Sequence, residues 1–293
     1  MTMTKSSSTS VSPTQSAATQ LCAVIGNPID HSRSPDIHHA FAQALQLPVR
    51  YERLLGEPEQ FETQVQDFFR QGGRGLNVTV PFKERAYQLT QDHCSPRAQL
   101  AGAVNTLWHH EGQLYGCNTD GEGLVFDLKR LAANPQEQQI LLLGAGGAAR
   151  GVIIPLLEAG CQQIRILNRR PERAKQLVAQ ALAQYPQAQG RLSAGSLSDT
   201  KGSWDIVINA TSASLSQQAP AHGPLQYRPQ SLAYDMVYGA QPTPFMRQAL
   251  AQGAARSADG LGMLVEQAAS SFALWFGQRP PTEPVIQRLR NQL

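Results

Sequence analysis

A glycine-rich turn directly after an apolar segment is the feature that most restricts the fold of this chain. Residues 140–143, Ile-Leu-Leu-Leu, are typical of a strand in a parallel sheet that is covered on both faces. The next six residues fit the pattern Gly-x-Gly-x-x-Gly/Ala and lead into a helix through residues 152–157. Glycine allows the tight turn and lets backbone amides approach a pyrophosphate, and a helix N-terminus favours an anion. A strand before the turn and a helix after it favour dinucleotide binding over a purely structural turn. The expected contacts are Gly144, Ala145, Gly146, Gly147 and Ala148.

The residues after the following strand favour NADP over NAD. Residues 164–167 form the expected strand, and Asn168, Arg169, Arg170 and Arg173 follow it. Domains that bind NAD usually have an acid here, which accepts hydrogen bonds from the adenosine ribose. Arginine at the start of a helix is unfavourable for the helix dipole, but it binds a ribose 2′-phosphate through charge-assisted hydrogen bonds. The sequence therefore predicts an NADP site that includes Asn168, Arg169 and Arg173.

Composition excludes several other classes of protein. The chain has 293 residues, of which 41% are hydrophobic, and 25 Lys and Arg residues oppose 22 Asp and Glu residues. A net charge of +3 gives no reason to expect nucleic acid or a membrane surface as a partner. No apolar segment approaches the roughly 20 residues that a membrane helix needs. We therefore expect a globular protein whose partner is a small molecule.

The cysteines and histidines indicate neither a disulfide framework nor a metal site. The four cysteines are scattered and never spaced as Cys-x-x-Cys, which favours a reducing cytoplasm. His31, His38 and His39 cluster near an expected helix start, without carboxylates or thiols at ligand spacing. Residues 1–20 are rich in Ser, Thr, Gln and Ala, and we expect them to form a disordered tail.

Strands and helices are expected to alternate along the chain. The sequence Ser34-Pro35-Asp36 has the signature of a helix start, with Ser34 as the N-cap. In the strand at 76–80 the apolar residues face one way, while Asn77 and Thr79 face the other and could meet a polar ligand. This alternation predicts an α/β protein with a doubly wound domain. The expected strands are 21–25, 49–53, 76–80, 140–143, 164–167, 204–208 and 232–236.

Short polar segments carry a resemblance to a known family. Each alone has a structural explanation as a cap, a turn or a surface cation. Taken together and in this order, they resemble the shikimate dehydrogenase family over essentially the whole chain from about Cys22. The segments are 31–35, 77–83, 102–106, 118–121, 209–212, 235–238 and 259–264 leading to Gln267.

The resemblance implies a set of site residues. Ser32 and Ser34 match the hydroxyls that bind the substrate carboxylate, and Tyr238 matches a tyrosine near the substrate. Lys83 and Asp120 match the catalytic pair. The residues that match ligands of the ring hydroxyls are Asn77, Thr79, Asn105, Asp120 and Gln267. Those on the nicotinamide side are Thr211, within the segment 209–212, together with Met236 and Gly260.

The chemistry of the matched pair agrees with hydride transfer. Hydride leaves C4 of NADPH for the C3 carbonyl of 3-dehydroshikimate, and negative charge grows on the carbonyl oxygen. Lys83 would supply a cation or a proton there, and Asp120 would hold and polarise Lys83. The predicted function is therefore the NADPH-dependent, reversible reduction of 3-dehydroshikimate to shikimate, a step of aromatic amino acid biosynthesis.

The resemblance also implies an architecture. We expect a substrate-binding domain from residues 21–118 and 263–293, and a Rossmann-like NADP-binding domain from residues 119–262, with the active site in the cleft between them. The chain would act as a monomer or a homodimer, and the sequence does not distinguish the two.

The chain departs from the family pattern at a few positions. The family commonly has glycine where this chain has Ser214, so we expect strain or a different loop there. His39 replaces a frequent amide, and Cys117 replaces a frequent acid or aromatic residue.

Two alternative functions agree less well with the sequence. A quinate/shikimate dehydrogenase often prefers NAD, which Arg169 and Arg173 oppose, and the serine pair leaves less room for an extra hydroxyl. A metabolite-sensing regulator of the same fold would not need Lys83 and Asp120 together, and no DNA-binding motif is visible. The enzyme is therefore the favoured interpretation.

Overall fold

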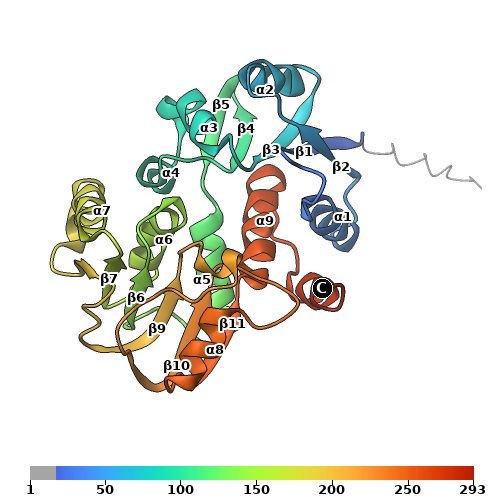
Figure 1. The fold of residues 1–293 in the computed structure, drawn as a ribbon. Coiled ribbons are helices and arrows are strands. Elements are labelled where there is room, and N and C mark those ends of the chain that lie inside the picture. The colour runs from blue at the N-terminus through green and yellow to red at the C-terminus, as the bar shows by residue number, and fades with distance from the viewer. Residues whose placement is uncertain (1–17) are drawn as a thin grey trace, which may run out of the picture.

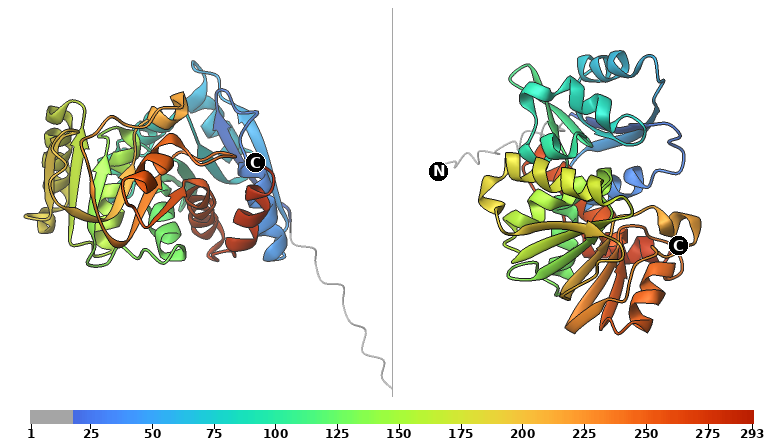
Figure 2. Two further views of the ribbon diagram at one scale, coloured as in Figure 1. Left: turned by 60° about the horizontal axis from the view of Figure 1, so that its bottom comes forward. Right: turned by 60° about the vertical axis from the view of Figure 1, so that its left-hand side comes forward.

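The computed structural model describes residues 18–293, which form two α/β lobes (Figures 1 and 2). The first strand starts at Gln20, one residue before the expected Leu21. Residues 1–17, most of the segment for which we predicted a disordered tail, lie outside the described part. The two lobes are built around separate sheets, as expected for a chain long enough for two hydrophobic cores.

The first lobe contains a mixed sheet with the strand order β2-β1-β3-β4-β5. β1, β2 and β3 are parallel, whereas β4 and β5 form an antiparallel hairpin that the sequence patterns did not reveal. The strands are β1 (Gln20–Gly26), β2 (Val49–Leu55), β3 (Gly73–Val78), β4 (Thr106–His110) and β5 (Gln113–Cys117). The helices of this lobe are α1 (Ser34–Ala44), α2 (Phe61–Arg70), α3 (Lys83–Leu89) and α4 (Pro96–Ala101).

The second lobe contains an all-parallel sheet with the order β11-β10-β9-β6-β7-β8. Chain order runs outward from β6 in both directions, so the predicted doubly wound domain is confirmed. The strands are β6 (Gln139–Leu143), β7 (Gln163–Asn168), β8 (Leu192–Ser196), β9 (Ser203–Asn209), β10 (Gln226–Asp235) and β11 (Arg256–Asp259). The helices are α6 (Gly147–Glu158), α7 (Pro171–Gln184) and α8 (Pro244–Ala251).

Helices α5 (Asp120–Arg130) and α9 (Leu261–Phe276) join the two lobes. They pack against each other between the sheets, where Figure 1 shows them side by side. α5 also packs on α6 of the second lobe, and α9 on α1 of the first lobe. The C-terminal helix α10 (Glu283–Arg290) covers the outer end of α9.

Close packing in the first lobe depends on a glycine in β3. Trp275 of α9 is 1% exposed, and its Nε1 donates to the Leu107 carbonyl at 3.1 Å. A Cβ atom added to Gly75 would lie 2.2 Å from the ring of Trp275. The sheet and α9 can approach this closely only because Gly75 lacks a side chain.

We therefore expect Gly75→Ala to destabilise the fold by about 1–3 kcal/mol, because the extra methyl group overpacks a rigid core. The midpoint of urea unfolding measures this loss. Gly239→Ala is the matched control, since the nearest atom to its added Cβ is 3.8 Å away. Equal midpoints for the two variants would contradict this account of the packing.

Candidate active site

A cavity of about 580 Å³ opens between the two lobes. The carboxyl ends of β1 and β3 contribute from the first lobe, and those of β9 and β10 from the second. All nine residues expected to bind substrate line this cavity: Ser32, Ser34, Asn77, Thr79, Lys83, Asn105, Asp120, Tyr238 and Gln267. Of the expected cofactor residues, Ala148, Thr211, Met236 and Gly260 also line it.

Lys83 and Asp120 form an ion pair in the cavity wall. Lys83 is the first residue of α3 and Asp120 the first of α5, and Lys83 Nζ lies 2.7 Å from Asp120 Oδ2. Asn105 Nδ2 donates to the other oxygen, Asp120 Oδ1, at 2.7 Å. The two side chains are 28% and 27% exposed, so both can meet a ligand. The carboxylate is held from both sides and fixes where the ammonium group lies.

The two serines lie at the start of α1. The helix begins at Ser34 with Arg33 as its N-cap, and no side chain caps it, so the predicted N-cap role of Ser34 is wrong. Pro35 lies in the first turn and has no N–H to be capped. Ser32 Oγ accepts from Ser34 N at 3.3 Å. Both serines line the cavity, and the Ser34 hydroxyl caps no helix and lies at a helix N-terminus, which favours an anion.

The amides of Asn77 and Asn105 belong to a buried hydrogen-bond network. Asn77 Oδ1 accepts from Tyr51 at 2.7 Å, and its Nδ2 donates to the Asn105 carbonyl at 3.1 Å and to Ser271 at 3.0 Å. Asn105 Oδ1 accepts from Thr119 N at 2.9 Å. Both N–H groups of Asn77 therefore have protein partners, so only its oxygen can take a further hydrogen bond.

Apolar and aromatic residues surround this network. His38 is 1% exposed and stacks on Tyr51 at 4.2 Å between ring centroids. Burial lowers the pKa of His38 to about 3, so the ring is neutral and forms part of the core. Burial also raises the pKa of Tyr51 and that of Tyr238. Tyr238 therefore remains a phenol that can donate a hydrogen bond into the cavity.

The glycine-rich turn has room for a ligand. Gly144 has φ +108°, and α6 begins at Gly147 with Gly146 as N-cap, so the turn and helix have the predicted geometry. A Cβ atom on Gly146 or Gly147 would meet nothing within 4 Å. Open space therefore lies beside the free amides of a helix N-terminus, as a pyrophosphate requires. Gly144, Ala145, Gly146 and Gly147 flank the cavity lined by Ala148 rather than lining it themselves.

Two exposed arginines extend this site beyond β7. Arg169 and Arg173 have no side-chain hydrogen bond or ion pair with any residue in the range 18–293. Asn168 Nδ2 donates to the Arg170 carbonyl at 2.9 Å and stabilises the turn into α7. Both guanidinium groups are thus available to an anionic ligand, and the residues present fit NADP.

The part of the cavity expected to bind nicotinamide is formed by the segments that follow β9, β10 and β11. Asn209 Oδ1 accepts from Thr211 N at 3.1 Å and from Thr211 Oγ1 at 2.7 Å, which fixes Thr211 at the cavity. Gly260 follows β11, and a Cβ atom there would lie 2.3 Å from the carbonyl oxygen of Met236, which follows β10. The segments after β10 and β11 therefore approach this closely only with glycine at position 260.

The expected strain at Ser214 is wrong. The left-handed residue of this loop is Gln217, with φ +54°, whereas Ser214 has no positive φ. Ser214 is 3% exposed, and its hydroxyl donates to Asp235 at 2.6 Å. The serine is accommodated because its side chain points into a buried polar cluster.

Sequence reasoning missed the apolar part of the cavity wall. These residues carry no polar signal, and in sequence they are indistinguishable from core residues. The main ones are Val80, Leu215, Met263 and Leu264. No group of three His, Cys, Asp or Glu residues with metal-site geometry occurs among residues 18–293.

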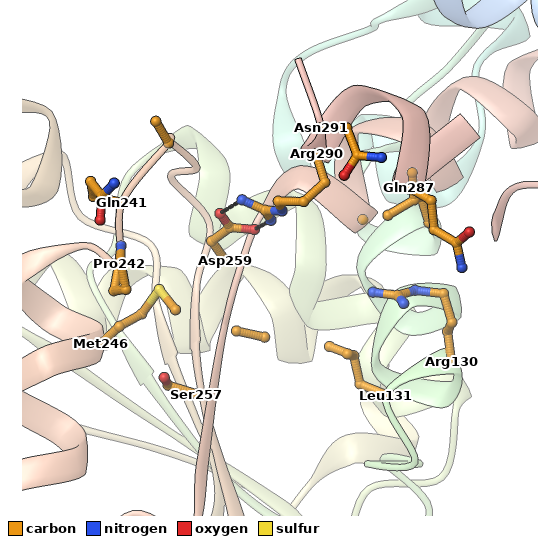
Figure 3. Close-up of a pocket in the computed structure, with 14 residues that line it drawn as sticks. Arg130, Leu131, Gln241, Pro242, Met246, Ser257, Asp259, Gln287, Arg290 and Asn291 are labelled. Carbon is orange, nitrogen blue, oxygen red and sulfur yellow. Dashed lines mark hydrogen bonds and ion pairs between the residues drawn. The ribbon is translucent and has the colours of Figure 1, made fainter. Parts of the chain in front are cut away.

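A second cavity, of about 550 Å³, lies beside α10 and contains none of the predicted site residues (Figure 3). Arg290 Nη1 donates to Asp259 Oδ2 at 2.8 Å, and Arg130 Nε donates to Asp127 Oδ1 at 2.7 Å. The charges of this cavity are already paired. The Arg290–Asp259 pair ties α10 to β11, the Arg130–Asp127 pair lies within α5, and we assign the cavity no part in the chemistry.

Comparison with known families and structures agrees with the geometry. Residues 24–107 match the shikimate dehydrogenase substrate binding domain, residues 128–218 match shikimate / quinate 5-dehydrogenase, and residues 260–290 match the shikimate 5′-dehydrogenase C-terminal domain. No helix in the range 18–293 is long and apolar enough to cross a membrane.

Relatives and solved structures cover most of the chain. A shikimate dehydrogenase (NADP(+)) of Bordetella avium is 56% identical over 92% of this chain and 95% of its own length. An Ael1 enzyme of Pseudomonas putida is 44% identical, with a TM-score of 0.83 over 92% of this chain and 98% of that one. A shikimate 5-dehydrogenase of Thermus thermophilus, solved with NADP(H) and shikimate, is 35% identical, with a TM-score of 0.78 over 94% and 100%. The chain therefore belongs to the shikimate dehydrogenase family.

Proposed function

We propose that this chain catalyses the reversible, NADPH-dependent reduction of 3-dehydroshikimate to shikimate on the route to aromatic amino acids. The observation that carries the proposal is the Lys83–Asp120 ion pair, at 2.7 Å, within a cavity that also holds the serine pair. The names of relatives at 56% and 54% identity support the same reaction and the same cofactor.

The first lobe binds the substrate. Ser32, Ser34 and the phenol of Tyr238 donate to the carboxylate, at the N-terminal end of α1 where an anion is favoured. Ring hydroxyls bind to Thr79, Asp120 and Gln267, and donate to the oxygen of Asn77. Asn105 also lines the cavity beside the ring hydroxyls, and its Nδ2 hydrogen bond orients Asp120.

The second lobe binds the cofactor. The turn from Gly144 to Ala148 holds the pyrophosphate, and Asn168, Arg169 and Arg173 hold the 2′-phosphate end. Thr211, Met236 and Gly260 lie on the nicotinamide side of the cavity. Bound NADPH supplies the hydride.

Lys83 provides the proton and the positive charge of the reaction. Its ammonium group faces the cavity, where it stabilises negative charge on the substrate carbonyl oxygen and delivers a proton to it. Asp120 keeps Lys83 in place and compensates its charge within a partly buried site.

We place the substrate-binding domain at residues 21–118 and 263–293 and the cofactor domain at 119–262, on either side of this cavity. The protein works in the cytoplasm, as its four free cysteines favour, and acts as a monomer or a homodimer.

The proposed reaction is tested by the appearance of reduced cofactor with shikimate or quinate and with NADP or NAD. We expect turnover mainly with shikimate and NADP. Turnover mainly with quinate and NAD would leave the proposed catalytic pair intact but contradict the proposed substrate and cofactor specificity. Folded protein that is inactive in all four assays would contradict the proposal that the chain is an enzyme of this kind.

Replacing the catalytic cation should abolish most turnover without affecting cofactor binding. We expect Lys83→Ala to lower kcat by about 10²–10⁴-fold, because general acid catalysis and charge stabilisation are both lost. NADPH binding, measured by fluorescence titration, should stay at the wild-type level. Lys201→Ala, an exposed lysine away from the cavity, is the control. Activity in Lys83→Ala equal to that of this control would exclude Lys83 from the mechanism.

Removing the two exposed arginines should change the cofactor preference. The double variant Arg169→Ser, Arg173→Ser should raise KM for NADP by about tenfold or more, because charge-assisted hydrogen bonds to the 2′-phosphate are lost. KM for NAD should change little, since NAD lacks that phosphate. Arg70→Ser, an exposed arginine on α2, is the control. An equal rise in both KM values would assign the arginines a general role instead.

A further inference from the structure

A buried carboxylate organises the cofactor side of the cavity. Asp235, at the end of β10, is 0% exposed. Ser214 and Thr243 each donate a hydroxyl to Oδ2 at 2.6 Å, and Asn209 Nδ2 and Val237 N donate to Oδ1 at 3.0 and 3.1 Å. None of the ion pairs within residues 18–293 includes Asp235. Hydrogen bonds from the neighbouring loops therefore satisfy this charge, and in return it fixes those loops.

Among the apolar side chains that these loops present to the cavity, Leu215 is the most exposed. Ser214 and Leu215 are consecutive in the short 3-10 helix Ala213–Ser216, yet Ser214 is 3% exposed and Leu215 is 70% exposed. The turn closes at Gln217 in the left-handed region, so the backbone reverses immediately afterwards. Because the hydroxyl of Ser214 is anchored inward on Asp235, the neighbouring Leu215 must point outward, and it lines the cavity.

A second exposed apolar side chain lines the same cavity from the other lobe. Val80 is 63% exposed and lies three residues before Lys83. Leu215 and Val80 have the two highest exposed fractions among the large hydrophobic residues of the described chain. Exposed apolar groups that share a cavity mark a surface that is covered when a ligand binds.

We propose that Leu215, aimed by the hydrogen bond from Ser214 to Asp235, covers the nicotinamide end of the bound cofactor and meets Val80 across the mouth of the cavity. The proposal rests on the proposed function, because it requires NADPH in this cavity. Leu215 contacts the cofactor, whereas Ser214 and Asp235 act as positioning residues. Exclusion of water by this apolar cover strengthens the interaction of Lys83 with the developing negative charge.

The fluorescence of bound NADPH tests the cover without catalysis. A dihydronicotinamide ring shielded from water emits more strongly, so Leu215→Ser should reduce the enhancement seen when NADPH is added to the full chain. Leu250→Ser removes a similarly exposed leucine from α8, which does not line the cavity, and should leave the enhancement unchanged. Thermal midpoints of both variants should match the wild type, because neither leucine is buried.

Turnover provides a second readout. Leu215→Ser should lower kcat by about tenfold, because water then weakens the electrostatic stabilisation at the reacting atoms. KM for shikimate should change less. Ser214→Ala should also lower the fluorescence of bound NADPH. The double variant Ser214→Ala, Leu215→Ser should lose no more fluorescence and no more kcat than Leu215→Ser alone, because both changes act through the side chain of Leu215.

The outcomes separate this proposal from the proposed function. If Leu215→Ser and Leu250→Ser gave the same NADPH fluorescence and the same kcat, the proposal that Leu215 covers the nicotinamide end of the cofactor would be contradicted. Additive losses in the double variant would overturn the positioning role of Ser214. If the wild-type protein turned over no shikimate but Leu215→Ser still reduced the fluorescence enhancement of NADPH, the proposed function would be contradicted, whereas the contact of Leu215 with the bound cofactor would remain supported.

Discussion

The carboxylate of Asp120 is the point at which the two lobes and the candidate chemistry meet. Asn105 reaches it from the position just before β4, Lys83 reaches it from α3, and Asp120 itself begins α5. α5 then packs between α6 of the second lobe and α9, which carries Gln267 back to the cavity. An ion pair of this partial exposure adds little stability by itself. Its importance is geometric, because three elements from distant parts of the sequence fix one ammonium group.

Glycines in α5 make that convergence possible. A Cβ atom on Gly121 would lie 2.1 Å from the Gly151 carbonyl oxygen of α6, and one on Gly123 would lie 2.6 Å from Gln267 N of α9. The three helices therefore approach by backbone contact directly behind Asp120. Gly121 lies within α5, and its lack of a side chain lets helix α6 approach closely. Close packing of α5 against α6 and α9 holds Asp120, the partner of Lys83, in place independently of the loops that form the rest of the cavity.

A feature could be predicted from the sequence when the residues that determine it are close together in the chain. The strand–turn–helix unit around Gly144 was predicted correctly because strand, glycines and helix start lie within about ten consecutive residues, and each has its own physical reason. Lys83 and Asp120 are 37 residues apart, and only the resemblance to a family connected them. Ser214 was misjudged because a buried partner 21 residues away determines its conformation. Leu215 was not recognised, since exposure of an apolar residue is a property of the folded chain alone. Val80 was expected to share the apolar face of a strand at 76–80, which is wrong, because β3 ends at Val78 and Val80 is 63% exposed.

Asp120, which lines the cavity, and Asp235, which is buried, show how different surroundings suit two carboxylates to different roles. Asp120 is 27% exposed and has one cationic partner that itself faces the cavity, so its charge is coupled directly to a group that can give up a proton. Asp235 is fully buried and accepts hydrogen bonds from four neutral groups, none of which can release a proton near neutral pH. The first arrangement is suited to chemistry and the second only to holding loops in place. The proposed reacting centre is the place where a carboxylate keeps both a cation and access to the cavity, and in this proposal the polar cluster around Asp235 only holds the neighbouring loops.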